Sequence, residues 1–183
     1  EEVGSNDMNY RQYRLNYFAI NALMERAYLW SGNTQKAGEY ARTVIEKVSD
    51  KNTPLFPLID ADYMEANSDR VFSPEVLFSL YNTSRPDVVY KTLFVPTLTM
   101  AGDLATGRVN ETYDDKNDYR YRMWESTVEN NREVTYFIKY MDETRTGSEA
   151  YRYMIPLIRM SELYLIAAEC ETNVQTALDK YFN

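Results

Sequence analysis

One apolar stretch, residues 154–169 with the sequence MIPLIRMSELYLIAAE, constrains the fold of this chain more than any other. It has too few polar residues to cover the solvent side of a surface helix, so a helix formed here would be buried on most sides. Pro156 suits the first turn of such a helix, because the first N–H groups of a helix have no intrahelical partner. We therefore predict a buried helix from about residue 155.

Three charged residues, Arg159, Glu162 and Glu169, interrupt this apolar stretch. At about 100° per residue they fall within one narrow stripe of a helix. We interpret the stripe as a structural ionic seam rather than a ligand site, with Arg159 and Glu162 paired three residues apart. Removing Arg159 is then expected to destabilise the protein, because a poorly solvated carboxylate would lose its partner.

A helical hairpin is predicted at the N-terminal end. Apolar residues spaced three and four apart indicate one helix at about residues 9–31 and a second at about 34–49. Gly32 can adopt the left-handed conformation between them, and Asn33 or Thr34 can cap the second helix. The residues expected on the buried faces are Tyr10, Tyr13, Tyr17, Ile20, Met24 and Ala27 in the first helix and Ala37, Ala41, Val44 and Val48 in the second.

The same hairpin recurs near the C-terminal end of the sequence. At a shift of 140 positions, identical residues stand at 23 and 163, 27 and 167, 33 and 173, 35 and 175, and 37 and 177. In the first copy, Tyr28, Gly32 and Ala37 have the spacing of a tetratricopeptide (TPR) unit. We therefore predict a second hairpin at about 155–183, with Leu163 and Ala167 buried.

The residues between the hairpins, about 51–150, are predicted to form a long insertion. Prolines at 54, 57, 74, 86 and 96 divide it. A short helix is expected at about 60–65, short strands at about 75–81 and 133–140, and loop with some helix at 102–132. The predicted fold is mainly α, a single domain over residues 1–183 with TPR-like helical hairpins and a loop-rich insertion that contains short strands.

Composition excludes several classes of function. The chain has no histidine and one cysteine, Cys170, so histidine-containing triads, histidine-ligated zinc and an internal disulfide are excluded. A net charge of −8 argues against nucleic acid as a partner, because binding phosphates needs a basic face. Asp114, Asp115 and Asp118 resemble a calcium cluster but lack the glycine and closing glutamate of an EF-hand loop. We predict no metal and no other cofactor.

The apolar stretch IPLIRMSELYLIAAE closely resembles the signature helix of the SusD/RagB family, cell-surface glycan-binding lipoproteins of Bacteroidetes outer membranes. Other segments match that family in order and approximate spacing, so the resemblance covers nearly the whole chain. They are NALMERAYLWSGNTQKAGEYARTVIE at 21–46, SPEVLFSLYN at 73–82, DYRYR at 118–122 and FIKYMD at 137–142. The resemblance implies the SusD-like α-α superhelix.

The resemblance also implies a function. Such proteins are nonenzymatic and capture a glycan or oligosaccharide, or in some cases a peptide, for import. They act at the outer-membrane cell surface with a SusC-like TonB-dependent transporter. Family members are usually more than twice as long as this chain, and they continue into an "ER-x-E-F" helix that is absent here. The resemblance therefore implies a fragment, with the lipid anchor outside this sequence.

The candidate glycan-binding residues lie in the insertion. Arg108, Asn110, Tyr113 and Trp124 combine aromatic rings with amide and guanidinium donors in loop-like sequence. Tyr113 and Trp124 are the expected stacking platform, and Arg108 and Asn110 the hydroxyl partners. The competing interpretation is that Asp118, Arg120 and Trp124 fix the loop to the helical scaffold.

Two other functions compete with glycan capture. A TPR-type protein-interaction module would present tandem hairpins, which the separation of the two copies disfavours. A glycoside hydrolase needs two carboxyl groups about 5–10 Å apart in a cleft. The abundant Asp and Glu residues leave a hydrolase open, although no recognisable catalytic spacing is present, and we therefore predict no catalytic residues.

Overall fold

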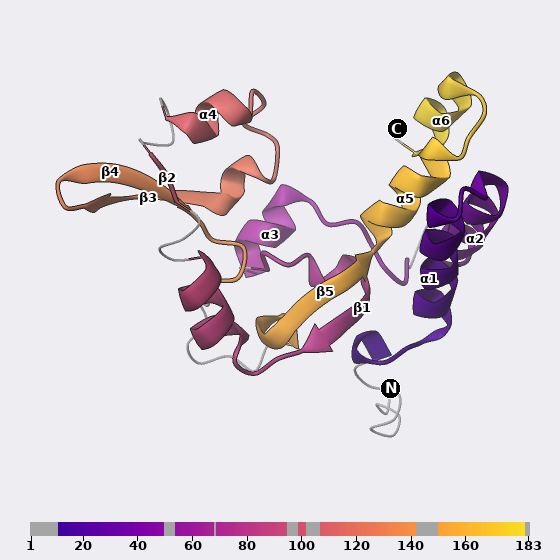
Figure 1. Cartoon of the computed structure of the whole chain (residues 1–183), viewed down its shortest axis with the longest axis horizontal. Coiled ribbons are helices and arrows are strands. Elements are labelled where there is room, and N and C mark those ends of the chain that lie inside the picture. The colour runs from indigo at the N-terminus through magenta and orange to yellow at the C-terminus, as the bar shows by residue number, and fades with distance from the viewer. Residues whose placement is uncertain are drawn as a thin grey trace. The chain divides into compact units, whose positions relative to one another are not determined.

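The structure is a computed structural model that describes residues 11–49, 54–67, 69–94, 99–101, 107–141 and 150–181. The α-helices are α1 (Tyr17–Trp30), α2 (Thr34–Val48), α3 (Ala61–Asn67), α4 (Arg108–Thr112), α5 (Met160–Glu169) and α6 (Val174–Tyr181). The strands are β1 (Val76–Tyr81), β2 (Thr99–Ala101), β3 (Trp124–Glu129), β4 (Arg132–Phe137) and β5 (Met154–Arg159). The α-helices α1 to α3 precede the first strand, α5 and α6 follow the last one, and α4 lies between β2 and β3 (Figure 1). Helices predominate, which confirms the predicted mainly α class.

The chain divides into two compact units. The first contains Glu1–Ile59, Phe72–Leu80 and Pro156–Asn183, and the second contains Asp60–Val71 and Tyr81–Ile155. Both helical hairpins therefore belong to one unit, although they come from opposite ends of the sequence. The strand segment Phe72–Leu80, which we placed in the insertion, also belongs to this first unit.

The first helix begins later than the predicted residue 9. The Oδ1 atom of Asn16 accepts a hydrogen bond from the N–H of Ala19 at 2.9 Å, so Asn16 caps α1 and the helix starts at Tyr17. Residues 9 and 10 lie outside the described residues. At the other end, Gly32 has φ of +79° and Asn33 accepts from the N–H of Lys36 at 3.1 Å. The predicted turn and cap of the second helix are confirmed.

The predicted buried face of α1 is wrong. Tyr17, Ile20 and Met24 are 49%, 51% and 37% exposed, and Ala19 and Ala22 are buried instead. The small alanines let α1 lie close against α2, whose buried face was predicted correctly. The buried residues of α2 are Ala37, Gly38, Ala41, Val44 and Val48.

The two hairpins pack against each other within the first unit. Gly38 of α2 is buried so closely that an added Cβ would lie 2.9 Å from the Cβ of Cys170, at the end of α5. The same unit contains a hydrophobic core, in which α5 supplies Met160 and Leu163. Its other buried members are Ala22, Val44, Val48, Leu77 and Ile158.

The predicted helix from residue 155 is wrong in its first turns. Met154–Arg159 is strand β5, which pairs with β1, and α5 begins only at Met160 (Figure 1). Arg159 has extended backbone angles, φ −127° and ψ 158°, and precedes the helix. A two-stranded sheet has only edge strands, so it tolerates Pro156, which has no N–H to donate.

The ionic seam on one helix is therefore also wrong. Arg159 lies on β5, where its guanidinium carbon is 5.4 Å from the centroid of the Phe72 ring, and Glu169 is exposed. Glu162 pairs with Arg26 of α1 instead: Nε and one terminal nitrogen of Arg26 each donate to a carboxylate oxygen at 2.6 Å. The same guanidinium donates to the carbonyl of Leu157 at 3.0 Å. One arginine thus holds α1 to both β5 and α5.

Alanine at Arg26 is expected to destabilise the protein by about 1–2 kcal/mol, because a two-bond ion pair and a main-chain bond are lost from a partly exposed site. Arg159→Ala should cost less, since it leaves the Glu162 pair intact. Urea unfolding of both variants measures the difference. A larger loss for Arg159→Ala would contradict the Arg26–Glu162 pairing.

The second hairpin repeats local details of the first. Asn173 accepts from the N–H of Thr176 at 3.0 Å, as Asn33 accepts from Lys36. Gln175 donates to Asp179 one turn later at 2.8 Å, and Gln35 donates to Glu39 in the same way at 3.1 Å. The shared Asn-x-Gln-x-Ala sequence therefore encodes the same helix start twice, and its alanines, Ala37 and Ala177, are both buried.

The second unit is built on a three-stranded antiparallel sheet in the order β2-β4-β3. β3 and β4 form a hairpin, with Trp124 opposite Phe137 and Glu129 opposite Arg132. Asn130 and Asn131 turn the chain with φ of 51° and 59°, as a two-residue type I′ turn requires. The strand β3 falls in residues 102–132, which we predicted as loop with some helix. The predicted strands at 75–81 and 133–140 and the helix at 60–65 are present as β1, β4 and α3.

Candidate functional site

Three of the four predicted binding residues lie on one short segment of the second unit. Arg108 and Asn110 are on α4, and Tyr113 follows directly as its C-terminal cap residue. Val109 is fully buried and anchors this helix, while Arg108 is exposed and Asn110 and Tyr113 are half-buried. An amide, a guanidinium and a phenol ring thus stand within one short, partly exposed segment of the unit.

The adjacent loop is held by Asp118 and Arg120. The guanidinium of Arg120 donates to Oδ2 of Asp118 at 2.6 Å and to Oδ1 at 3.0 Å, and the backbone N–H of Arg120 donates to Oδ1 at 2.8 Å. These hydrogen bonds to Arg120 lower the pKa of the Asp118 carboxyl below its usual value. The guanidinium carbon of Arg120 lies 5.5 Å from the Tyr113 ring centroid. Asp118 therefore orients an arginine that lies over the Tyr113 ring.

Trp124, the fourth predicted residue, occupies a different environment. It begins β3, and its ring centroid is 5.1 Å from that of Phe137. Phe137 in turn stacks on Phe94 at 6.1 Å. The indole nitrogen Nε1 of Trp124 is buried and has no hydrogen-bond partner in the part of the chain that the structure describes. The structure therefore places Trp124 in an aromatic cluster with Phe137 and Phe94, and the other three residues on or directly after α4.

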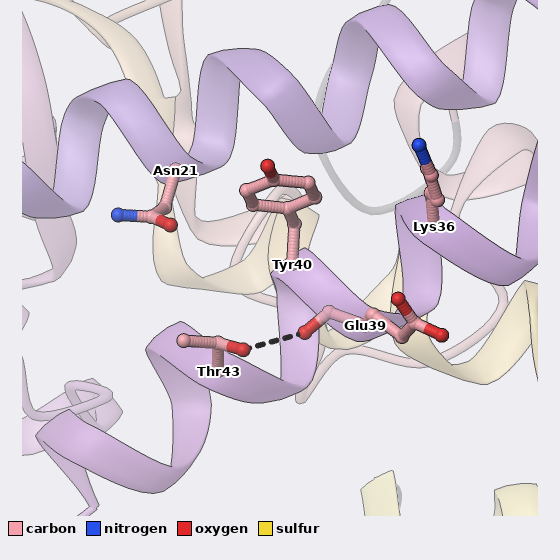
Figure 2. Close-up of a pocket in the computed structure, with 5 residues that line it drawn as sticks. All are labelled: Asn21, Lys36, Glu39, Tyr40 and Thr43. Carbon is pink, nitrogen blue, oxygen red and sulfur yellow. Dashed lines mark hydrogen bonds between the residues drawn. The ribbon is translucent and has the colours of Figure 1, made fainter.

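Sequence reasoning missed a pocket on the first unit. It measures about 270 Å³ and is lined by Asn21 of α1 and by Lys36, Glu39, Tyr40 and Thr43 of α2 (Figure 2). The four α2 residues recur at the three- and four-residue spacing of one helix face, beside the buried face. In the sequence, the pocket is indicated by this polar face of α2, but a polar helix face is more often simply solvated than part of a binding site.

The described residues contain no group of three or more Cys, Asp or Glu side chains placed to hold a metal ion. The Asp114, Asp115 and Asp118 cluster therefore gains no support as a calcium site. Burial, and the nearby charge of Glu169, raise the pKa of the Cys170 thiol, which keeps it protonated and a poor nucleophile. Among the described helices, none combines the length and apolar character that crossing a membrane requires.

Comparison with known proteins identifies the family. The model of the SusD family matches residues 23–183, nearly the whole chain. This chain belongs to the SusD family. The resemblance to the SusD/RagB family is thereby confirmed. No curated protein matches the sequence.

Solved structures of SusD-like proteins share the fold. A SusD superfamily protein from Bacteroides thetaiotaomicron is 26% identical with a TM-score of 0.63, and the match covers 92% of this chain and 40% of that one. A SusD-like carbohydrate-binding protein from Bacteroides vulgatus is 18% identical, with a TM-score of 0.59 and coverage of 92% and 36%. A laminarin-binding SusD-like protein is 16% identical, with a TM-score of 0.58 and coverage of 97% and 48%. The chain thus spans less than half the length of these SusD-like structures.

Proposed function

We propose that this SusD-family chain is part of a nonenzymatic cell-surface protein that captures a glycan for import. The match of the family model over residues 23–183 carries the proposal. Two structural relatives are described as carbohydrate-binding and laminarin-binding, which supports a glycan as the ligand class. The family also supports attachment at the outer membrane and a SusC-type TonB-dependent transporter as the partner.

Residues 108–113, which comprise α4 and Tyr113 and are called the α4 segment below, supply chemistry suited to a glycan. The Tyr113 ring can stack on a pyranose, while Asn110 and Arg108 can donate hydrogen bonds to its hydroxyl groups. The Arg120 guanidinium lies over the ring and holds it, which reduces the entropy lost when a sugar binds. Trp124 contributes less directly, because its ring packs on Phe137 and can support the sheet beside the site.

Tyr113→Ala is expected to weaken glycan binding several-fold, up to about tenfold, because one aromatic stacking contact is worth about 0.5–1.5 kcal/mol. Tyr113→Phe keeps the ring and should bind nearly as the parent does. Calorimetric titration with laminarin and a panel of other soluble glycans measures both, and chromatography of the mixtures tests for cleavage. Equal affinity of the alanine variant would remove α4 from the proposal, and release of shorter sugars would overturn the nonenzymatic role.

A further inference from the structure

We infer that the pocket between α1 and α2 binds a single uncharged sugar ring, as a second glycan contact separate from the α4 segment. The inference rests on the proposed function for its ligand class. Small-molecule sites typically measure about 300–1,000 Å³, so a pocket of about 270 Å³ suits one ring rather than an extended chain. All five lining residues stand on two packed helices, so the site is formed before the ligand arrives.

Tyr40 provides the apolar surface of the pocket. Figure 2 shows its ring between Asn21 and Lys36, with Glu39 and Thr43 nearby on the same helix. Tyr28 of α1 stacks on Tyr40 with ring centroids 5.5 Å apart and planes 19° apart, and the Lys36 ammonium lies 5.0 Å from the Tyr28 centroid. The Tyr40 ring is therefore held in place, and little side-chain entropy is lost when a sugar packs against it.

Several of the polar atoms around Tyr40 are hydrogen-bond acceptors. Asn21 uses its Nδ2 to donate to the carbonyl of Tyr17 at 2.7 Å, which leaves its Oδ1 to accept. The Thr43 hydroxyl donates to the carbonyl of Glu39 at 2.8 Å (Figure 2), so it too offers an acceptor to a ligand. Gln35 holds the Glu39 carboxylate through one oxygen at 3.1 Å. Such a pocket suits a ligand that donates from several hydroxyl groups, which is the chemistry of a neutral sugar.

The same arrangement selects against acidic sugars. A sugar carboxylate is a further acceptor and would stand beside the negative charge of Glu39. Lys36 offsets part of this repulsion, but its ammonium is directed over Tyr28. At about 4 Å, two like charges in water repel by roughly 1 kcal/mol, which corresponds to about fivefold in affinity. Glucose is therefore expected to bind about fivefold more tightly than glucuronate.

The test is a titration of the isotope-labelled chain with glucose and with glucuronate, followed through backbone amide resonances. Glucose should shift amides of residues 36–43, with dissociation constants in the millimolar range, and glucuronate should need about fivefold higher concentration.

Glu39→Gln should bring the two sugars to similar affinity. Glu46→Gln removes the same charge from an exposed position on the same helix and should leave the preference unchanged. Thr43→Val, which keeps the shape and removes one acceptor, should weaken glucose about fivefold.

The outcomes separate this inference from the proposed function. Shifts at residues 108–113 without shifts at 36–43 would overturn the pocket and leave glycan capture standing. Shifts at 36–43 alone would support the pocket and remove α4 as the contact. A preference for glucuronate, or a Glu39→Gln variant that behaves as Glu46→Gln does, would overturn the assignment to an uncharged ring. The absence of shifts at both segments with these sugars would overturn the pocket, and the glycan panel would then decide the proposed function by itself.

Discussion

The protein is expected to lose stability between about pH 5 and pH 8, and replacing Glu25 with glutamine is expected to remove most of that loss. Glu25 lies on α1 and is fully buried, and neither of its carboxylate oxygens has a hydrogen-bond partner among the described residues. Burial raises the pKa of its carboxyl to about 8, and the charge of Glu162 adds to this, while Arg26 opposes it. The negative charge of Glu25 also contributes to the raised pKa of the Cys170 thiol, at the end of α5.

The direction of the pH effect follows from the raised pKa. Below pH 4.5, the normal value for glutamic acid, Glu25 is protonated in both states and carries no penalty. Between pH 4.5 and about 8 the folded protein keeps the proton that the unfolded chain has lost, so the free energy of unfolding falls as pH rises. The slope is about 1.4 kcal/mol per pH unit, which amounts to several kcal/mol over the range. Above about pH 8 the penalty is constant.

Urea unfolding at pH 5, 6.5 and 8.5 measures the effect. The parent should lose several kcal/mol relative to Glu25→Gln across this series, and the variant should be the more stable protein at pH 8.5. Glu46→Gln, which removes a charge from an exposed position of α2, should follow the parent. Parallel curves for the parent and Glu25→Gln would show that Glu25 is hydrated in solution.

Leu163→Ala should cost about 2–5 kcal/mol, the usual range for a fully buried leucine. Leu163 is fully buried in the core of the first unit, among Ala22, Val44, Leu77 and Ile158. Because these neighbours belong to α1, α2, β1 and β5, the cavity would open where four elements meet and could not close by moving one of them. Since total stabilities are commonly about 5–15 kcal/mol, such a loss is large for this chain.

Leu165 offers a matched control, two residues along the same helix and 58% exposed. Leu165→Ala removes the same atoms and makes the same change in helix propensity, but opens no cavity, so it should change stability by less than about 0.5 kcal/mol. Thermal and urea unfolding of both variants give the difference. Equal losses would mean that helix propensity, rather than burial, explains the effect of Leu163→Ala.

Local sequence was sufficient where the deciding interactions are local. Asn33 and Asn173 each cap a helix by accepting a hydrogen bond from the N–H three residues later. Gly32 takes the left-handed backbone conformation in the turn between α1 and α2. The 3.6-residue spacing of α2 identified its buried face, because this helix has one apolar side and one polar side. The IPLIRMSELYLIAAE stretch identified the family, but it did not show that its first part is a strand and its second part a helix.

Tertiary structure decided the rest, because the remaining choices depend on partners far away in the sequence. The apolar residues 154–159 fit a strand or a helix equally, and pairing with β1 made them a strand. Both sides of α1 carry apolar residues, and only the close approach of α2 buried Ala19 and Ala22 and left Tyr17 and Ile20 exposed. Arg26 and Glu162 stand 136 positions apart, and the polar face of α2 became one wall of a pocket only when α1 supplied the other. The sequence by itself therefore determined the helix starts, the face of α2 and the family. Long-range packing determined which faces are buried, which charges pair and where a ligand has room to bind.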